Sequence, residues 1–133
     1  MLARYPGHAK RIFDEIVQLK DLDNVSDLAS LSHLNAFINE TMRLYPTAMT
    51  GSSRITSAEG ATIDGTFIPG NVQIAAPKYT IFRLESAFEQ PLEFIPERWY
   101  SRPELIKDSR AFAPFGVGKK SVPFYMEFIT MTS

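Results

Sequence analysis

The sequence predicts an α+β fold with two amphipathic helices, a small antiparallel β-hairpin sheet and a long irregular meander rich in proline and aromatic residues. Apolar residues recur at helical spacing up to residue 45, and apolar and polar residues alternate around Asp64-Gly65. Four prolines then interrupt residues 85–114. The 133 residues have the length of one ordinary domain, and a hydrophobic content of 44% is sufficient for a core.

The first predicted helix covers residues 6–19. Pro6 suits the first turn of a helix, where its missing N–H is not needed. Four apolar residues follow at helical spacing and predict its buried face: Ile12, Phe13, Ile16 and Val17. A charged break over residues 20–24 and a short helical turn over residues 25–31 come next.

The second predicted helix ends at Tyr45, because Pro46 cannot continue it. Ser30 or Ser32 is the predicted N-cap. One apolar stripe is predicted to face the core: Leu34, Phe37, Ile38, Thr41, Met42 and Tyr45.

Glu40 and Arg43 lie on the other side of this helix, three residues apart and able to touch. Periodicity alone favours a solvent-exposed ion pair that contributes about 0.2–0.5 kcal/mol.

The middle of the chain predicts strands. A Thr/Gly/Ser-rich link over residues 47–53 leads to a hairpin of strands 61–63 and 66–68, joined by Asp64-Gly65, because both turn residues tolerate the positive φ of a type I′ turn. Pro69-Gly70 makes a second turn, a further strand follows over residues 72–76, and residues 78–83 form a short helix. Residues 85–114 carry too many aromatic rings for a disordered segment, so we expect them to pack irregularly against another element.

Composition excludes several classes of function. The formal net charge is -1, from 14 basic and 15 acidic residues, which predicts no nucleic-acid partner. The chain has no cysteine, which excludes disulfides, zinc–thiolate sites and cysteine nucleophiles within these residues. His8 and His33 show no ligand spacing, and we expect both to be ordinary cap or surface residues. The apolar residues 122–131 are too short to span a bilayer, so no membrane segment is expected in this chain.

Several short motifs follow one another in a fixed order. The first is Glu40-Thr-Met-Arg43-Leu-Tyr-Pro46, and the hairpin continues into Phe67-Ile-Pro-Gly70. The others are Ala76-Pro-Lys-Tyr79, Phe94-Ile-Pro-Glu-Arg-Trp99 and Phe112-Ala-Pro-Phe-Gly-Val-Gly118.

Together these motifs resemble the cytochrome P450 family, the haem-thiolate monooxygenases. The chain is similar to a C-terminal portion of a fungal or microsomal-type member that is truncated at the haem-binding loop. The resemblance implies a partial cytochrome P450 domain over residues 1–121, a fragment of that mainly α fold. Residues 122–133 resemble nothing that follows in the family, and we expect them to be a non-family tail.

The resemblance assigns a structural role to three charged residues. It implies that Glu40, Arg43 and Arg98 form a buried charge network, in which the carboxylate accepts from two guanidinium groups and holds the meander on the second helix. Breaking such a buried network costs on the order of 3–5 kcal/mol. The network would support a cofactor site, and no catalytic residue is expected in this chain.

The resemblance also points to a haem site. The family pattern is Phe-x-x-Gly-x-x-x-Cys-x-Gly, in which Phe115 and Gly118 match and Val122 occupies the position of the cysteine ligand. Valine offers no lone pair, so no metal ligand is expected. The resemblance implies these cofactor-binding residues: Arg54, Pro114, Phe115, Gly118 and Lys120. For Arg54 and Lys120, the candidates for haem propionates, the alternative is a solvated basic residue on a loop.

In the family this site belongs to a haem- and iron-dependent oxidoreductase that inserts oxygen from O2 into small organic substrates. The resemblance implies an NADPH-dependent reductase as partner and, often, anchorage to the endoplasmic reticulum membrane. Because Val122 replaces the ligand, and the oxygen-handling helix lies outside the matching portion, we expect this chain to be inactive alone and not to bind haem as a thiolate complex. The alternative is a noncatalytic binding or interaction module derived from the same fold.

Overall fold

The structure is a computed structural model that describes residues 1–19, 23–51 and 53–116. Its helices are η1 (Leu2–Arg4), α1 (Pro6–Ile16), α2 (Val25–Ser30), α3 (Ser32–Leu44), α4 (Lys78–Ile81), η2 (Pro96–Trp99), η3 (Pro103–Leu105) and η4 (Ser109–Ala111). Its strands are β1 (Ser53–Ile55), β2 (Ala61–Ile63), β3 (Thr66–Ile68) and β4 (Gln73–Ala75). The predicted α+β fold is confirmed.

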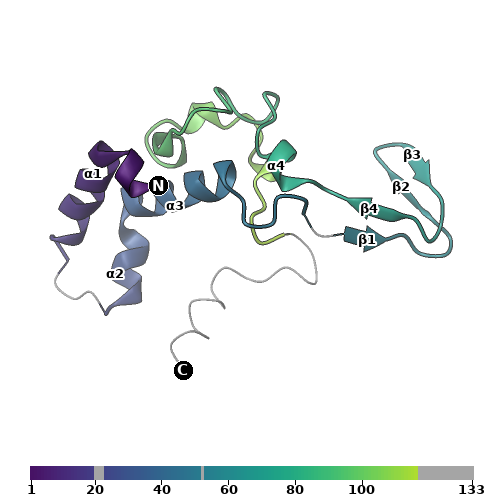
Figure 1. Cartoon of the computed structure of the whole chain (residues 1–133), viewed down its shortest axis with the longest axis horizontal. Helices are drawn as coiled ribbons and strands as arrows, with labels where there is room; N and C mark the ends of the chain where they lie inside the picture. The colour runs from purple at the N-terminus through teal and green to yellow at the C-terminus, as the bar shows by residue number, and fades with distance from the viewer. Residues whose placement is uncertain (20–22, 52, 117–133) are drawn as a thin grey trace.

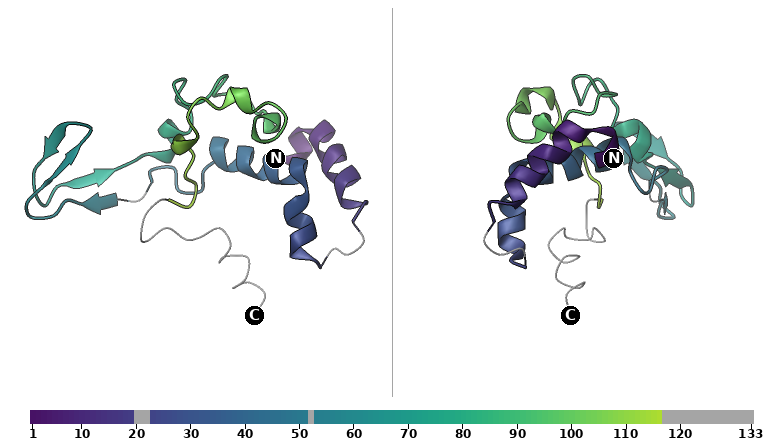
Figure 2. Two further views of the ribbon diagram at one scale, coloured as in Figure 1. Left: turned by 180° about the vertical axis from the view of Figure 1, so that it is seen from behind. Right: turned by 60° about the vertical axis from the view of Figure 1, so that its left-hand side comes forward.

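Helix α3 lies at the centre of the arrangement (Figure 1). Helix α1 packs on its N-terminal part, and the segment that contains η2 packs along it. In the views of Figure 2 the irregular segment after α4 runs over α3, while the strands extend away from the helices. The core therefore lies between α3 and the irregular segment, where Phe82 and Phe88 are almost completely buried.

Helix α1 is shorter than predicted and buries less of its apolar face. It ends at Ile16. Ile12 is buried, whereas Phe13 and Val17 are 63% and 58% exposed. The prediction that all four apolar residues face the core is wrong, because Ile12 alone is buried in the helix.

The apolar stripe predicted for α3 is also wrong. Of its six members only Phe37 is buried, and Ile38 and Tyr45 are exposed. The buried face of α3 consists of His33, Ala36, Phe37, Glu40, Arg43 and Leu44. The helix therefore turns its charged pair toward the irregular segment, so the solvent-exposed ion pair that periodicity favours is not found.

The caps of α3 come from distant elements. Neither predicted serine caps the helix, since Leu31 occupies the N-cap position without a side-chain hydrogen bond. Instead the carboxylate of Glu15 accepts hydrogen bonds from the backbone N–H groups of His33 (2.8 Å) and Leu34 (2.9 Å). This negative charge complements the positive end of the helix dipole and joins α1 to α3.

The strands form two separate antiparallel pairs. In the predicted hairpin β2 pairs with β3, with Thr62 opposite Phe67. Asp64 and Gly65 have φ values of 47° and 74°, which match the predicted type I′ turn. The further strand, β4, pairs instead with β1, which was not predicted and begins at the end of the Thr/Gly/Ser-rich link.

The irregular segment is packed, as predicted. Three short 3-10 helices interrupt it, and a single β-bridge joins Phe88 to Ile106. Phe88 is fully buried. Backbone hydrogen bonds from Glu89 N to Leu105 O and from Lys107 N to Ala87 O, both 2.8 Å, join residues 87–89 to residues 105–107. Within residues 1–19, 23–51 and 53–116, no helix has the length and apolar character needed to cross a bilayer.

Candidate functional site: a buried charge network beside a loop

The structure brings Glu40, Arg43 and Arg98 into direct contact. Glu40 Oε1 accepts from Arg43 Nη2 at 2.8 Å, from Arg98 Nε at 3.1 Å and from the backbone N–H of Ile95 at 2.9 Å. Its other oxygen, Oε2, accepts from Arg43 Nε at 2.9 Å and from the Trp99 indole N–H at 3.0 Å. One carboxylate therefore accepts five hydrogen bonds, of which the three from Ile95, Arg98 and Trp99 connect α3 to η2 and its N-cap.

The remaining N–H groups of the two guanidinium groups donate hydrogen bonds to backbone carbonyls of the irregular segment and of the turn after α4. Arg43 donates to the carbonyl oxygens of Phe82 (2.8 Å), Pro91 (2.6 Å) and Glu93 (3.1 Å). Arg98 donates to those of Glu89 (3.0 Å), Gln90 (3.2 Å) and Leu105 (3.3 Å). A segment without regular structure has few backbone partners of its own, and the arginines supply them.

The charge network of Glu40, Arg43 and Arg98 is fully buried. All three side chains have an exposed fraction of 0%. Burial lowers the pKa of Arg98 from its ordinary value, and Glu40 opposes this shift. No buried side-chain nitrogen or oxygen of the described residues lacks a hydrogen-bond partner. Satisfied bonding of this kind is what makes buried charges tolerable.

Trp99 links the charge network to the loop that carries Pro114 and Phe115. Its indole N–H is bound to Glu40, and its ring packs against Phe112 with centroids 4.5 Å apart. Phe112 also contacts Phe82, at 5.3 Å between centroids. The start of the loop thus rests on aromatic side chains whose positions the charge network holds.

The loop reaches a pocket at the C-terminal end of α3. The pocket has a volume of about 190 Å³, and its lining includes Met42, Pro46, Lys78, Pro114 and Phe115. Lys78, at the start of α4, donates from Nζ to the carbonyl oxygen of Pro114. The structure therefore places two of the family-implied residues, Pro114 and Phe115, side by side on one small cavity.

The other family-implied residues are not brought to this pocket. Arg54 lies exposed on β1, where Nη1 donates to the neighbouring carbonyl of Ser53 at 2.9 Å, and it does not line the cavity. Gly118 and Lys120 lie outside the described residues, as do Val122 and the expected tail.

Comparison with known proteins decides the family. The model of the family described as "Cytochrome P450" matches residues 1–121. The chain belongs to the cytochrome P450 family. It is 42% identical over 123 residues to the cytochrome P450 monooxygenase sthD of Phaeosphaeria nodorum, and 43% identical over 125 residues to the cytochrome P450 monooxygenase notG' of Aspergillus versicolor. Both alignments cover 90% of this chain.

A third relative of this cytochrome P450 chain is the tryprostatin B 6-hydroxylase of Aspergillus fumigatus, which is 47% identical over 94 residues, or 71% of the chain. The chain spans only 26%, 23% and 17% of the lengths of these three relatives. The alignments therefore show the family to which these residues belong, and each alignment covers only a minor part of the relative.

The residues of this cytochrome P450 chain do not fit a thiolate-bound haem. The chain has no cysteine. Its two histidines are no substitute at the pocket. His33 lies nine residues before Met42 on α3, a rise of about 13 Å along the helix, and His8 lies against His33, with 3.1 Å between ring nitrogens. The pocket is lined by Lys78, Thr47 and apolar side chains. Among these only the Met42 thioether belongs to the usual haem-iron ligands, and it is not a thiolate.

Sequence reasoning missed several parts of the site. It did not find Trp99 as a hydrogen-bond donor, the backbone N–H of Ile95, or Lys78 as the partner of Pro114. Trp99 carried the only available signal, since a buried indole N–H needs an acceptor and Glu40 was already expected to be buried nearby. The hydrogen bond from the Ile95 amide and the one from Lys78 to a backbone carbonyl correspond to no recognisable sequence pattern.

Proposed function

We propose that these residues are the part of a haem-dependent monooxygenase that holds the haem-binding loop in place, acting as structural support without catalytic groups of their own. The observation that carries the proposal is the continuous path from the charge network through Trp99 and Phe112 to Pro114 and Phe115. A loop that must present a cofactor ligand needs a rigid base, and a fully satisfied buried network supplies one.

The names of the relatives support the monooxygenase reaction and an organic substrate. Two are cytochrome P450 monooxygenases, and the third is a hydroxylase of tryprostatin B. We accordingly infer that the whole protein would act on a small organic molecule with O2, with electrons from a reductase.

These 133 residues are inactive alone under this proposal, because Val122 stands where the family has its cysteine. A test is to mix the purified chain with haem, reduce it and add carbon monoxide. The expected spectrum lacks the band typical of a thiolate-bound haem. A thiolate-type band from the unchanged chain would refute the proposal, and Val122→Cys is the matched variant that supplies the missing ligand atom.

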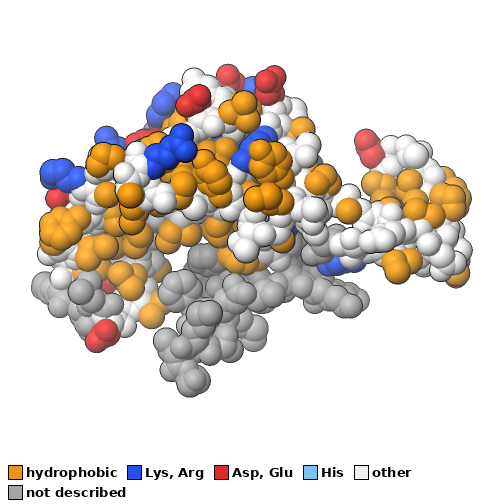
Figure 3. Space-filling model, viewed as in Figure 1, with side chains coloured by type: hydrophobic (Ala, Val, Ile, Leu, Met, Phe, Trp, Pro, Cys, Tyr) orange, Lys and Arg blue, Asp and Glu red, His pale blue; other side chains and the backbone are white. Residues whose placement is uncertain are grey.

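A noncatalytic binding module is the second candidate, and the apolar surface of the molecule favours it. Figure 3 shows hydrophobic side chains gathered over the helical part and on the distant strands. Phe13, Ile55 and Phe67 are 63%, 72% and 62% exposed. Contiguous apolar surface usually marks a partner or an aggregation liability. Monodisperse protein with one sharp unfolding transition supports the module, whereas aggregation supports a scaffold that depends on further parts of the protein.

A further inference from the structure

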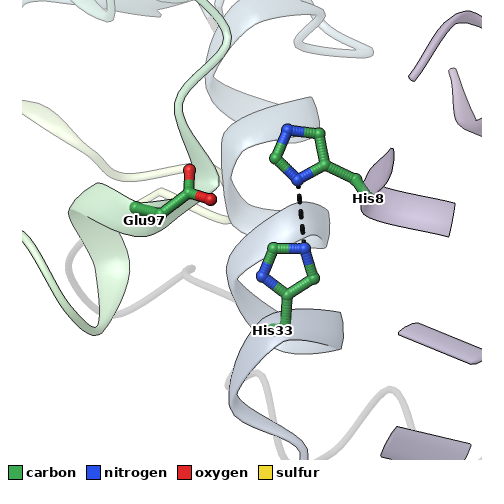
Figure 4. A group of neighbouring side chains, drawn as sticks. All are labelled: His8, His33 and Glu97. Carbon is green, nitrogen blue, oxygen red and sulfur yellow. Dashed lines mark hydrogen bonds between the residues drawn. The ribbon is translucent and has the colours of Figure 1, made fainter. Parts of the chain in front are cut away.

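The two histidines of the chain meet a glutamate where α1, α3 and η2 come together. His8 comes from α1, His33 from the first turn of α3 and Glu97 from η2 (Figure 4). One potential ligand atom from each of the three residues lies within 4.8 Å of the other two. This cluster is remote from the pocket beside Pro114 and takes no part in the function proposed above.

We propose that His8, His33 and Glu97 bind one divalent cation of the zinc class. Two imidazole nitrogens and one carboxylate oxygen are a donor set that zinc accepts, with a water molecule in the fourth position of a tetrahedron. Each ligand comes from a different element, so the cation would tie α1 and η2 to the N-terminal end of α3.

The separation of the two ring nitrogens suits a shared cation. His8 Nδ1 and His33 Nε2 are 3.1 Å apart and form a hydrogen bond. In a tetrahedral site with zinc–nitrogen bonds near 2.0–2.1 Å, two nitrogen ligands lie about 3.3 Å apart. A small displacement of the half-buried His8 therefore converts the hydrogen bond into a bridge through the metal.

Metal binding requires a particular tautomer of His8 and of His33, and the two rings together keep the same number of protons. Coordination needs lone pairs on His8 Nδ1 and His33 Nε2, so each imidazole must carry its proton on its other nitrogen. For His33 that nitrogen is Nδ1, which lies 3.1 Å from the Tyr100 hydroxyl and can donate to it. A hydrogen-bonded second nitrogen is the usual arrangement for a histidine that binds a metal.

The surroundings also favour neutral, ordered ligands. His33 is only 4% exposed, and burial, followed by the nearby His8, lowers its pKa. Aromatic rings surround His8: Phe94 stands edge-on at 5.8 Å, and Phe37 is tilted at 6.1 Å between centroids. Both imidazoles are thereby held in position before a cation arrives.

The positive charge of Arg11 opposes the binding of a cation. Its Nη1 lies 2.6 Å from Glu97 Oε1, and the arginine is exposed. A carboxylate has two oxygens, so Glu97 can offer the second to a metal while Arg11 keeps the first. Arg11 therefore weakens the site without blocking it.

Metal titration of the full chain tests the proposal. After treatment with a chelator the protein is titrated with Zn²⁺, and separately with Co²⁺, whose visible absorption reports tetrahedral geometry. The chain has two histidines and no cysteine, so an imidazole-bound cobalt spectrum can arise only at this cluster. We expect one equivalent to bind and the thermal unfolding temperature to rise with metal concentration. Absence of saturable binding would overturn the proposal.

Variants separate this site from general surface binding. His8→Gln and Glu97→Gln change residues that are less buried than His33, and each should weaken zinc binding at least about tenfold. Glu104→Gln alters an exposed carboxylate in η3 and should leave affinity unchanged. Arg11→Gln should strengthen binding, because the competing cation is gone. Unchanged affinity in either His8→Gln or Glu97→Gln would overturn the assignment.

Discussion

At Glu40, one carboxylate accepts five hydrogen bonds from four residues, and three of these residues lie between positions 95 and 99. Both oxygens accept hydrogen bonds, and the side chain is fully buried from water. Charge-assisted bonds are roughly twice as strong as neutral ones, and a low dielectric strengthens them further. Glu40 is therefore a main anchor of the irregular segment on α3, together with the bonds from Arg43 to the carbonyl oxygens of Pro91 and Glu93.

Glu40→Gln should destabilise the chain by on the order of 3–5 kcal/mol, because two buried guanidinium groups lose their counter-charge and the amide turns a donor toward one of them. Unfolding in urea measures the change. The control is Asp14→Asn in the exposed pair with Lys10, 2.7 Å apart, where the loss should stay below about 1 kcal/mol. Equal losses in the two variants would contradict a structural role for the charge network.

Trp99→Phe isolates the indole hydrogen bond. The smaller ring can still pack against Phe112, whereas Glu40 Oε2 loses its donor at 3.0 Å. We expect a loss of about 1–3 kcal/mol, since a buried acceptor is left partly unsatisfied. Urea unfolding gives the free energy, and fluorescence cannot serve as the probe because the chain has only one tryptophan. A loss as large as that of Glu40→Gln would instead indicate that ring packing dominates.

At the level of elements, α3 is held at both ends by charges from other parts of the chain. Glu15 of α1 accepts from the first turn, and Arg83 donates to the carbonyl oxygen of Leu44 at the last turn. A negative charge at the N-terminus and a positive charge at the C-terminus both favour the helix dipole. The helix thus obtains from tertiary contacts the caps that its own serines do not provide.

The β2–β3 hairpin depends on backbone conformation at one glycine, and two matched substitutions test this. A Cβ atom at Gly7 or at Gly65 would meet nothing within 4 Å, so packing is the same in both. Gly65 has φ = 74°, which costs an L-residue about 1–2 kcal/mol. Gly65→Ala should therefore destabilise the hairpin.

Gly7 lies in α1 and does not have a positive φ. Gly7→Ala should stabilise the chain by about 0.5–1 kcal/mol, because alanine favours a helix. Thermal unfolding followed by circular dichroism measures α1, and amide exchange measures the hairpin. A stabilising effect at both positions would show that the turn does not require its positive φ.

Elements whose cause is local could be predicted from the sequence. The Asp64-Gly65 turn was predicted correctly because two adjacent residues determine its type. The buried face of α3 was not, because helical periodicity counts Ile38 as core and Arg43 as surface. Arg43 is buried because carbonyls of the irregular segment accept its hydrogen bonds, and its partner Glu40 is buried because Arg98 supplies a second counter-charge. All these partners lie more than forty residues away along the chain. Only the family resemblance carried that information.

Across the whole molecule, burial is distributed unevenly. Residues 53 to 76 contain one buried side chain, Thr56. Thr56 Oγ1 donates to Pro69 O at 2.7 Å and accepts from Val72 N at 2.9 Å, which ties the two strand pairs together. Two-stranded pairs without an apolar face are marginal in water. The stability of the strands therefore depends on turn geometry and on Thr56. The charge network and the buried aromatic rings stabilise the other described elements.

This division predicts two levels of protection in native-state hydrogen exchange. Amides of residues 61–68 should exchange through local opening, at least about tenfold faster than those of Glu89 and Lys107, whose bonds to Leu105 and Ala87 lie against buried Phe88. Exchange measured by mass spectrometry on peptic peptides, corrected for intrinsic rates, resolves the two levels. Glu40→Gln should raise exchange at Glu89 and Lys107 and leave residues 61–68 almost unchanged, because the strands open independently of the charge network. Equal rates in both regions, or a parallel rise in the variant, would show that strands and core unfold as one cooperative unit.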